Sequence, residues 1–107
     1  MMIRHIVLVR LRSGVEDHAV DGVVRELAAL QSVLPGILSV SGGRSQSPEQ
    51  IERGYLHGFV IDFDSWAALH RYLEDPRHKE AGQALVALCE GGVEGVLVFD
   101  YEVDVAP

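Results

Sequence analysis

The sequence predicts an α+β fold in which a four-stranded antiparallel sheet carries its helices on one face. The first observation is the order of the segments, which runs strand, helix, strand, strand, helix, strand. The second is composition, because 48% of the 107 residues are apolar, enough to form one hydrophobic core. The third is that turn residues, such as the Pro35–Gly36 and Gly91–Gly92 pairs, separate the segments. We therefore expect a single domain over residues 1–107.

The first strand is predicted over residues 2–12, where β-branched and other apolar residues dominate. A helix is predicted next, because Glu16 and Asp17 place negative charge in what would be its first turn. Apolar residues then recur every three or four positions as far as Leu34, which is typical of a helix with one buried face. The Pro35–Gly36 pair is expected to end this helix.

The middle of the chain predicts two strands joined by a long polar loop. Residues 37–43 form a short strand, and residues 44–54 contain a proline that cannot continue it. Residues 55–63 alternate in the manner of a third strand. Asp64 or Ser65 is then expected to cap a short helix.

A second helix is predicted to begin at Asp75 and Pro76, because aspartate is a favoured N-cap and proline a favoured first residue. It is expected to run to about Cys89 and to stop at the Gly91–Gly92 pair. Residues 93–103 form the fourth predicted strand. Alternation places three large residues on one face of that strand: Leu97, Phe99 and Tyr101.

This order of elements is that of the ferredoxin-like, split βαβ fold. With the helices on one side, the other face of the sheet is uncovered, and we expect that face to be too apolar to remain in water. A second copy that packs sheet against sheet would bury it, so we expect a homodimer with a shared, barrel-like interior. The apolar residues expected on the uncovered face are Ile6, Leu8, Leu56, Val60, Val96 and Val98.

Charge and composition exclude several classes of function. The formal net charge is -7 and no run of Lys or Arg is present, so we do not expect nucleic acid as a partner. No apolar stretch approaches the roughly 20 residues that cross a bilayer, and the first residues do not resemble a signal peptide. The single cysteine suits a reducing compartment. We expect a cytoplasmic protein that binds neither nucleic acid nor a membrane.

Histidine and tyrosine residues are the candidates for chemistry. Alternation places His5, His57 and Phe59 on the face that we expect the helices to cover. Tyr72 falls on the apolar side of the short helix, and His78 is the third residue of the next one. The positive end of that helix dipole favours a neutral imidazole, so His78 is a candidate general base. The Tyr72 hydroxyl is a candidate hydrogen-bond donor to an enolate oxygen.

Two alternative interpretations of these residues remain open at this point. Histidine and tyrosine side chains at such positions are often hydrogen-bonded core groups rather than catalytic ones. A metal site built from His5, His57 and His78 has suitable ligands, but no metal-binding spacing supports it. No carboxylate is obviously on the same face either, although Asp62 and Asp64 alternate away from His57 only in part. We expect no metal and no cofactor.

Four short segments resemble one known family: Arg4–Leu8, Gly54–His57, Tyr72 with Asp75–His78, and Phe99–Tyr101. Over almost its whole length the chain is similar to the stress-responsive dimeric α+β barrel family, called Dabb. The resemblance implies a ferredoxin-like fold and a homodimer closed by paired sheets. It also implies a small-molecule pocket between the sheet and the helices of each subunit.

One enzyme of that family closes a linear polyketide by aldol condensation, and the resemblance implies roles for matching residues here. Tyr72 and His78 match its catalytic residues, and His5 and His57 match histidines that line its pocket. Asp75 departs from the pattern, because the enzyme has a histidine there.

Three functions follow from the residues and the resemblance together. The first is a cyclase or lyase that uses enolate chemistry on an apolar, carbonyl-bearing small molecule. The second is a non-catalytic stress or scaffold protein, because some members of the family have no established reaction. The third is a cofactor-free monooxygenase, since antibiotic-biosynthesis monooxygenases share the fold.

Overall fold

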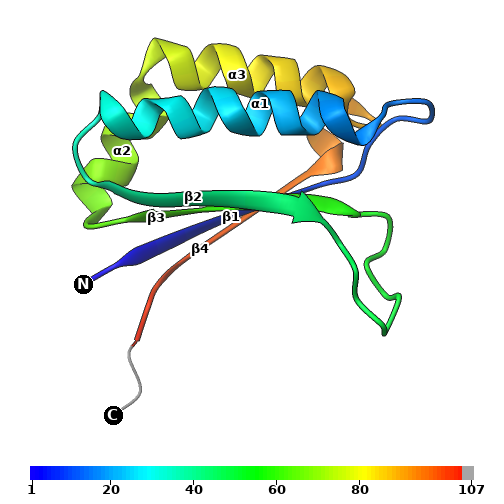
Figure 1. Cartoon of the computed structure of the whole chain (residues 1–107), viewed down its shortest axis with the longest axis horizontal. Helices are drawn as coiled ribbons and strands as arrows, with labels where there is room; N and C mark the ends of the chain where they lie inside the picture. The colour runs from blue at the N-terminus through cyan, green and yellow to red at the C-terminus, as the bar shows by residue number, and fades with distance from the viewer. Residues whose placement is uncertain (105–107) are drawn as a thin grey trace.

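A computed structural model describes residues 1–104 and shows the order of elements that the sequence predicts (Figure 1). Short 3-10 helices follow the first α-helix, at Leu30–Ser32, and precede the last strand, at Gly92–Gly95. The main elements are β1 (Ile3–Val9), α1 (Asp17–Ala29), β2 (Ile37–Arg44), β3 (His57–Phe63), α2 (Trp66–Glu74), α3 (Pro76–Leu88) and β4 (Val96–Glu102).

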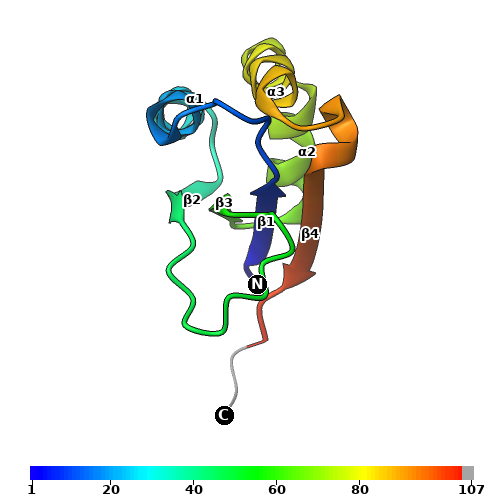
Figure 2. The ribbon, with the colours of Figure 1, turned by 90° about the vertical axis from the view of Figure 1, so that its right-hand side faces the viewer.

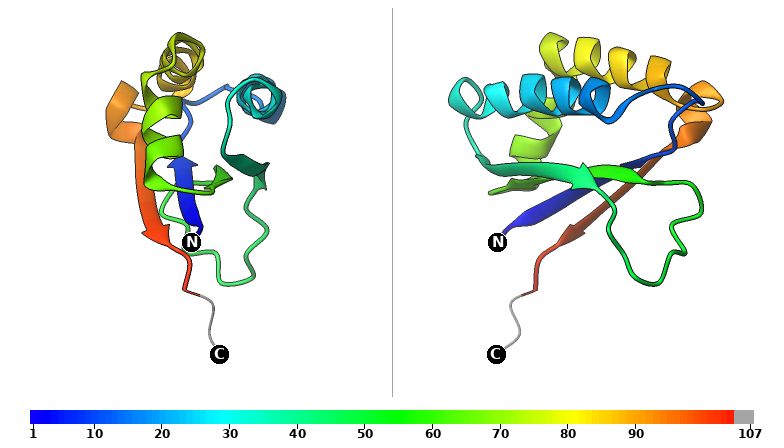
Figure 3. Two further views of the ribbon diagram at one scale, coloured as in Figure 1. Left: turned by 90° about the vertical axis from the view of Figure 1, so that its left-hand side faces the viewer. Right: turned by 45° about the vertical axis from the view of Figure 1, so that its right-hand side comes forward.

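The four strands form one sheet in the order β2-β3-β1-β4, and every neighbouring pair is antiparallel. The helices lie over one face of this sheet, and in residues 1–104 no helix covers the other face (Figures 2 and 3). The predicted ferredoxin-like α+β fold is confirmed.

Strand β1 shows how alternation builds the core. Its odd-numbered residues are buried and its even-numbered residues are only partly buried. In β3, Phe59 lies opposite Val7 and Ile61 lies opposite His5, so the covered faces of both strands contribute to the same layer. Burying this apolar face against the helices is the main contribution to stability. His5 and His57 lie on it and are 3% and 5% exposed, as the alternation predicted.

The predicted face of β4 is wrong. Val96 and Val98 were expected on the uncovered face, but Val96 pairs with Val9 and Val98 with Val7, which places both on the helix side. The uncovered face of β4 instead carries Leu97, Phe99 and Tyr101, opposite Leu8, Ile6 and Arg4. Both sets of alternate residues in this strand are largely apolar, so only the pairing with β1 determines which set faces the helices.

The two helices after β3 begin where the sequence predicts. The Ser65 side chain caps α2 by accepting a hydrogen bond from the Ala68 backbone N–H at 3.1 Å. Asp75 caps α3 by accepting from the Arg77 N–H at 2.8 Å, and Pro76 is the first residue of that helix. Since Asp75 also ends α2, the two helices meet at a single residue.

This cap makes the stability of the fold depend on pH. Hydrogen bonds from Arg77 lower the pKa of Asp75 from 3.8 to about 2. Because the folded value lies below the unfolded one, the carboxylate stabilises the protein above about pH 3.8, and this contribution is lost as the pH falls toward 2. We expect Asp75→Asn to lower the free energy of unfolding near neutral pH, and the difference from wild type to shrink over that acidic range.

Denaturant unfolding at a series of pH values measures this difference. Asp21→Asn is the control, because it removes the same charge from an exposed position of α1. If the difference in unfolding free energy between Asp75→Asn and wild type did not change with pH, the proposed role of the Asp75 carboxylate would be contradicted.

Candidate functional site

A cavity of about 220 Å³ lies between the covered face of the sheet and α3. Its walls are mostly apolar and include Phe59. Four residues with polar side chains also line it: His5 from β1, Tyr72 from α2, His78 from α3 and Asp100 from β4. An apolar cavity with a few converging polar groups is the usual form of a small-molecule site.

Tyr72 is at the centre of the polar residues in this cavity. Its ring centroid lies 4.3 Å from that of His78 and 5.9 Å from that of His5. Phe63 packs on it as well, with 5.2 Å between ring centroids. The structure therefore brings together three predicted site residues from β1, α2 and α3, and Phe59 lines the same cavity.

The His78 ring is held in one orientation. Its Nδ1 lies 3.1 Å from the backbone oxygen of Leu73, and a carbonyl oxygen only accepts hydrogen bonds, so Nδ1 carries the proton. The neutral ring then keeps its lone pair on Nε2. Burial lowers the pKa of His78 below its ordinary value of 6.5, which keeps the ring neutral near pH 7. A neutral ring with a lone pair on Nε2 can accept a proton.

The Tyr72 hydroxyl keeps its proton at neutral pH. The residue is 1% exposed, and burial raises the pKa of Tyr72 well above its ordinary value of 10.0. It therefore stays protonated at neutral pH and can donate a hydrogen bond to an oxygen that gains negative charge.

His5 is paired with a carboxylate that the sequence analysis did not find. Its Nδ1 lies 2.5 Å from Oδ1 of Asp100, directly across the β1–β4 pair. No carboxylate was obvious on this face from the sequence, because the predicted orientation of β4 places Asp100 on the uncovered side. Asp100 alternates with Val96 and Val98, so the correct phase would have placed it in the cavity wall.

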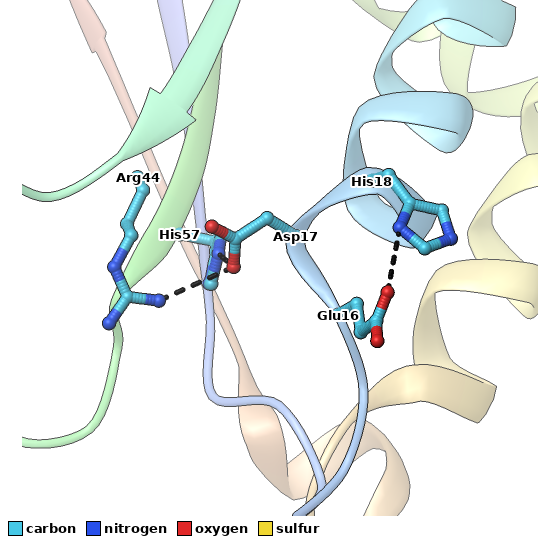
Figure 4. Close-up of polar contacts among 5 residues, drawn as sticks. All are labelled: Glu16, Asp17, His18, Arg44 and His57. Carbon is cyan, nitrogen blue, oxygen red and sulfur yellow. Dashed lines mark hydrogen bonds and ion pairs between the residues drawn. The ribbon is translucent and has the colours of Figure 1, made fainter.

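His57 lies apart from the other candidates. It is not among the residues that line the cavity, and its Nε2 lies 2.7 Å from Oδ1 of Asp17 at the start of α1. Asp17 also accepts a hydrogen bond from Arg44 at 3.3 Å (Figure 4). The hydrogen bond from His57 lowers the pKa of Asp17. The sequence analysis found Asp17 only as a charge in the first helical turn, because its partner is 40 residues away.

The metal-ligating and thiol groups of the described residues form no further site. Among residues 1–104, no group of three or more His, Cys, Asp or Glu side chains is arranged to hold a metal ion. Cys89 is buried, and its thiol donates to the Leu85 carbonyl at 3.2 Å. Across the same part of the chain, no helix has the length and apolar character needed to span a membrane.

Two curated proteins align with nearly the whole chain. The stress-response A/B barrel domain-containing protein HS1 of Arabidopsis thaliana is 26% identical over 100 residues, which cover 94% of this chain and 88% of that protein. Olivetolic acid cyclase of Cannabis sativa is 21% identical over 101 residues, which cover 94% of this chain and 96% of that protein.

Solved structures show the same fold. A dimeric ferredoxin-like protein of unknown function from Jannaschia sp. CCS1 is 34% identical, with a TM-score of 0.82, and the match covers 96% of this chain and all of that one. The hydroxynitrile lyase from Passiflora edulis has a TM-score of 0.81 at 23% identity, covering 99% and 97% of the two chains. The cofactor-independent oxygenase SnoaB from Streptomyces nogalater has a TM-score of 0.76 at 13% identity, covering 98% and 95%. At such low identity, the lyase and the oxygenase show only the fold.

The family comparison agrees with the segments quoted from the sequence. The sequence model of the Stress responsive A/B Barrel Domain, Dabb, matches residues 3–103. The chain therefore belongs to the Dabb family of stress-responsive A/B barrel domains.

Proposed function

We propose that this protein binds an apolar, carbonyl-bearing small molecule in the cavity beside His78 and catalyses a cyclisation or lysis through an enolate. One observation carries the proposal: a neutral imidazole with a free Nε2 lies 4.3 Å, between ring centroids, from a phenol that stays protonated. The two groups supply the base and the hydrogen-bond donor that enolate formation requires.

The proposed step begins when Nε2 of His78 accepts a proton from the carbon next to the ligand's carbonyl group. The electron pair of that C–H bond forms the enolate, and the Tyr72 hydroxyl donates a hydrogen bond to the enolate oxygen. In a cyclisation, the enolate carbon attacks a second carbonyl of the same molecule, and the new alkoxide takes the proton back from the His78 imidazolium. A lysis runs in reverse: Nε2 first takes the proton of a hydroxyl group two carbons from the carbonyl carbon, the alkoxide becomes a carbonyl as the carbon–carbon bond breaks to give the enolate, and the imidazolium then returns the proton to the enolate carbon.

The remaining cavity residues are assigned to binding. Phe59 and the other apolar walls contact the body of the ligand, and burying that body supplies the affinity. The Asp100 carboxylate holds the His5 ring in place, so His5 orients the ligand. His57 contacts Asp17 outside the cavity, and we assign it no direct contact with the ligand.

The relatives support this chemistry without determining it. One curated relative is a cyclase and one similar structure is a hydroxynitrile lyase. A non-catalytic role is the competing proposal, since Tyr72 and His5 are 1% and 3% exposed and core hydrogen-bonding groups would be buried in the same way. No contact in the cavity favours an oxygenase.

We also propose that two copies pair through the uncovered face of the sheet. Leu97 and Phe99 are 47% and 60% exposed there, beside Ile6 and Leu8. Large apolar side chains gathered on one sheet face are typical of an interaction surface. The similar protein from Jannaschia sp. CCS1 is dimeric, which agrees with this arrangement.

Catalysis is tested by hydrogen–deuterium exchange at the methyl group of acetophenone in D₂O, followed by NMR. This probe is an apolar ketone, and exchange reports enolate formation directly. We expect the wild-type protein to accelerate exchange. His78→Ala and Tyr72→Phe should each reduce the acceleration by about 10²-fold or more, the usual effect of removing a general base or an oxyanion donor.

The control for this assay is His70→Ala, which removes an exposed imidazole from α2. It should leave the exchange rate unchanged, and circular dichroism should show that all three variants are folded. Equal exchange rates in wild type, His78→Ala and Tyr72→Phe would refute the catalytic proposal. Reduced stability as their only effect would favour the non-catalytic alternative.

Pairing of the uncovered faces is tested by native mass spectrometry. We expect wild type to be a dimer and Phe99→Asp to be a monomer, because burying an unpaired carboxylate in an apolar interface is strongly unfavourable. Val33→Asp is the control, since Val33 is 53% exposed but follows the 3-10 helix Leu30–Ser32, on the helix side of the sheet. A monomeric wild type, or a Phe99→Asp variant that stays dimeric, would contradict the proposed interface.

A further inference from the structure

A stripe of three half-buried residues runs along α3, between its buried and exposed sides. The residues are four positions apart, so they lie nearly in line along the helix. They line the cavity on one side and a groove on the outer surface of the helix on the other. We call this groove the outer groove; Lys79 and Gln83 also line it. The stripe consists of His78, Gly82 and Val86.

Gly82 leaves a gap in the middle of this stripe. A Cβ atom placed on it would have no neighbour within 4 Å, so packing does not require glycine at this position. Glycine is also the least favourable residue for a helix interior after proline. What glycine preserves here is the empty space between the side chains of His78 and Val86, at the boundary of the cavity and the outer groove.

The volume of the cavity limits the part of a ligand that it can enclose. A buried cavity of about 150 Å³ holds benzene, so the 220 Å³ beside His78 accommodates one ring with a small substituent. A longer substituent on that ring needs a way out. Gly82 has no side chain, and it lines both the cavity and the outer groove. A substituent can therefore leave the cavity over Gly82 and enter the outer groove.

We infer that Gly82 determines the length of the ligand, with a ring and its carbonyl group in the cavity and a chain that passes over Gly82 into the outer groove. The inference rests on the proposed function, because it takes His78 and Tyr72 as the groups that face the carbonyl. It assigns the ligand to a class, namely aryl or cyclic carbonyl compounds with an extended substituent on the ring.

Two probes with the same head group test this inference: 4-methylacetophenone and 4-butylacetophenone. Their dissociation constants are measured by isothermal titration calorimetry on wild type, Gly82→Leu and Gly22→Leu. We expect Gly82→Leu to weaken binding of the butyl compound by about tenfold or more and to change binding of the methyl compound by less than about threefold. Such selective loss follows if the leucine side chain fills the gap in the stripe.

Gly22→Leu is the matched control. Gly22 is also half-buried in the interior of a helix and has no neighbour within 4 Å of a built Cβ, but it does not line the cavity or the outer groove. This variant should bind both compounds as wild type does. Gly82→Ala, which adds only a methyl group, should weaken binding of the butyl compound in the same direction but less, which excludes a general disturbance by leucine.

The outcomes separate this inference from the proposed function. Suppose that wild type binds both compounds and that Gly82→Leu weakens both equally or changes neither. The role of Gly82 is then refuted, while the proposal that the protein binds apolar, carbonyl-bearing molecules stands. If wild type binds neither compound, the proposed ligand class fails and the inference fails with it.

Discussion

The junction between α2 and α3 is the constraint on which the rest of the site depends. Asp75 ends one helix and caps the next, so the last turn of α2 and the first turn of α3 are held side by side. The Leu73 carbonyl belongs to that last turn, where helices leave carbonyl groups without intrahelical partners. His78 donates to it, and this one bond both satisfies the carbonyl and leaves Nε2 of the imidazole free. Tyr72 is brought against the same ring.

The two faces of the sheet have separate roles in this account. The covered face supplies the floor of the cavity, and the β1–β4 pairing places Asp100 against His5 there. The uncovered face exposes Phe99 and its apolar neighbours, through which we propose that two copies pair. Both roles depend on which residues of β4 point toward the helices. If β4 were shifted by one residue relative to β1, Asp100 and Phe99 would exchange faces.

Local signals in the sequence were enough to predict the fold and three of the four polar residues that line the cavity. The Asp75–Pro76 cap fixed the start of α3, and counting from it placed His78 in the first turn. The missing parts depend on contacts between distant segments. Asp100 reaches His5 through strand pairing across 95 residues, and Asp17 binds His57 across 40. No repeating pattern in the sequence indicates contacts between residues so far apart. Because both faces of β4 carry apolar residues, the sequence also does not show which face of this strand points toward the helices.

The most direct test of the central claim is to measure the protonation state of His78. Long-range proton–nitrogen NMR correlation on uniformly ¹⁵N-labelled protein reports this state, and the His78→Ala variant assigns the signals. The account predicts a neutral ring near pH 7 with the proton on Nδ1, and a pKa below 6.5, because burial disfavours the imidazolium. A proton on Nε2 would leave no free base at that atom. An imidazolium at pH 7 would contradict the account as well.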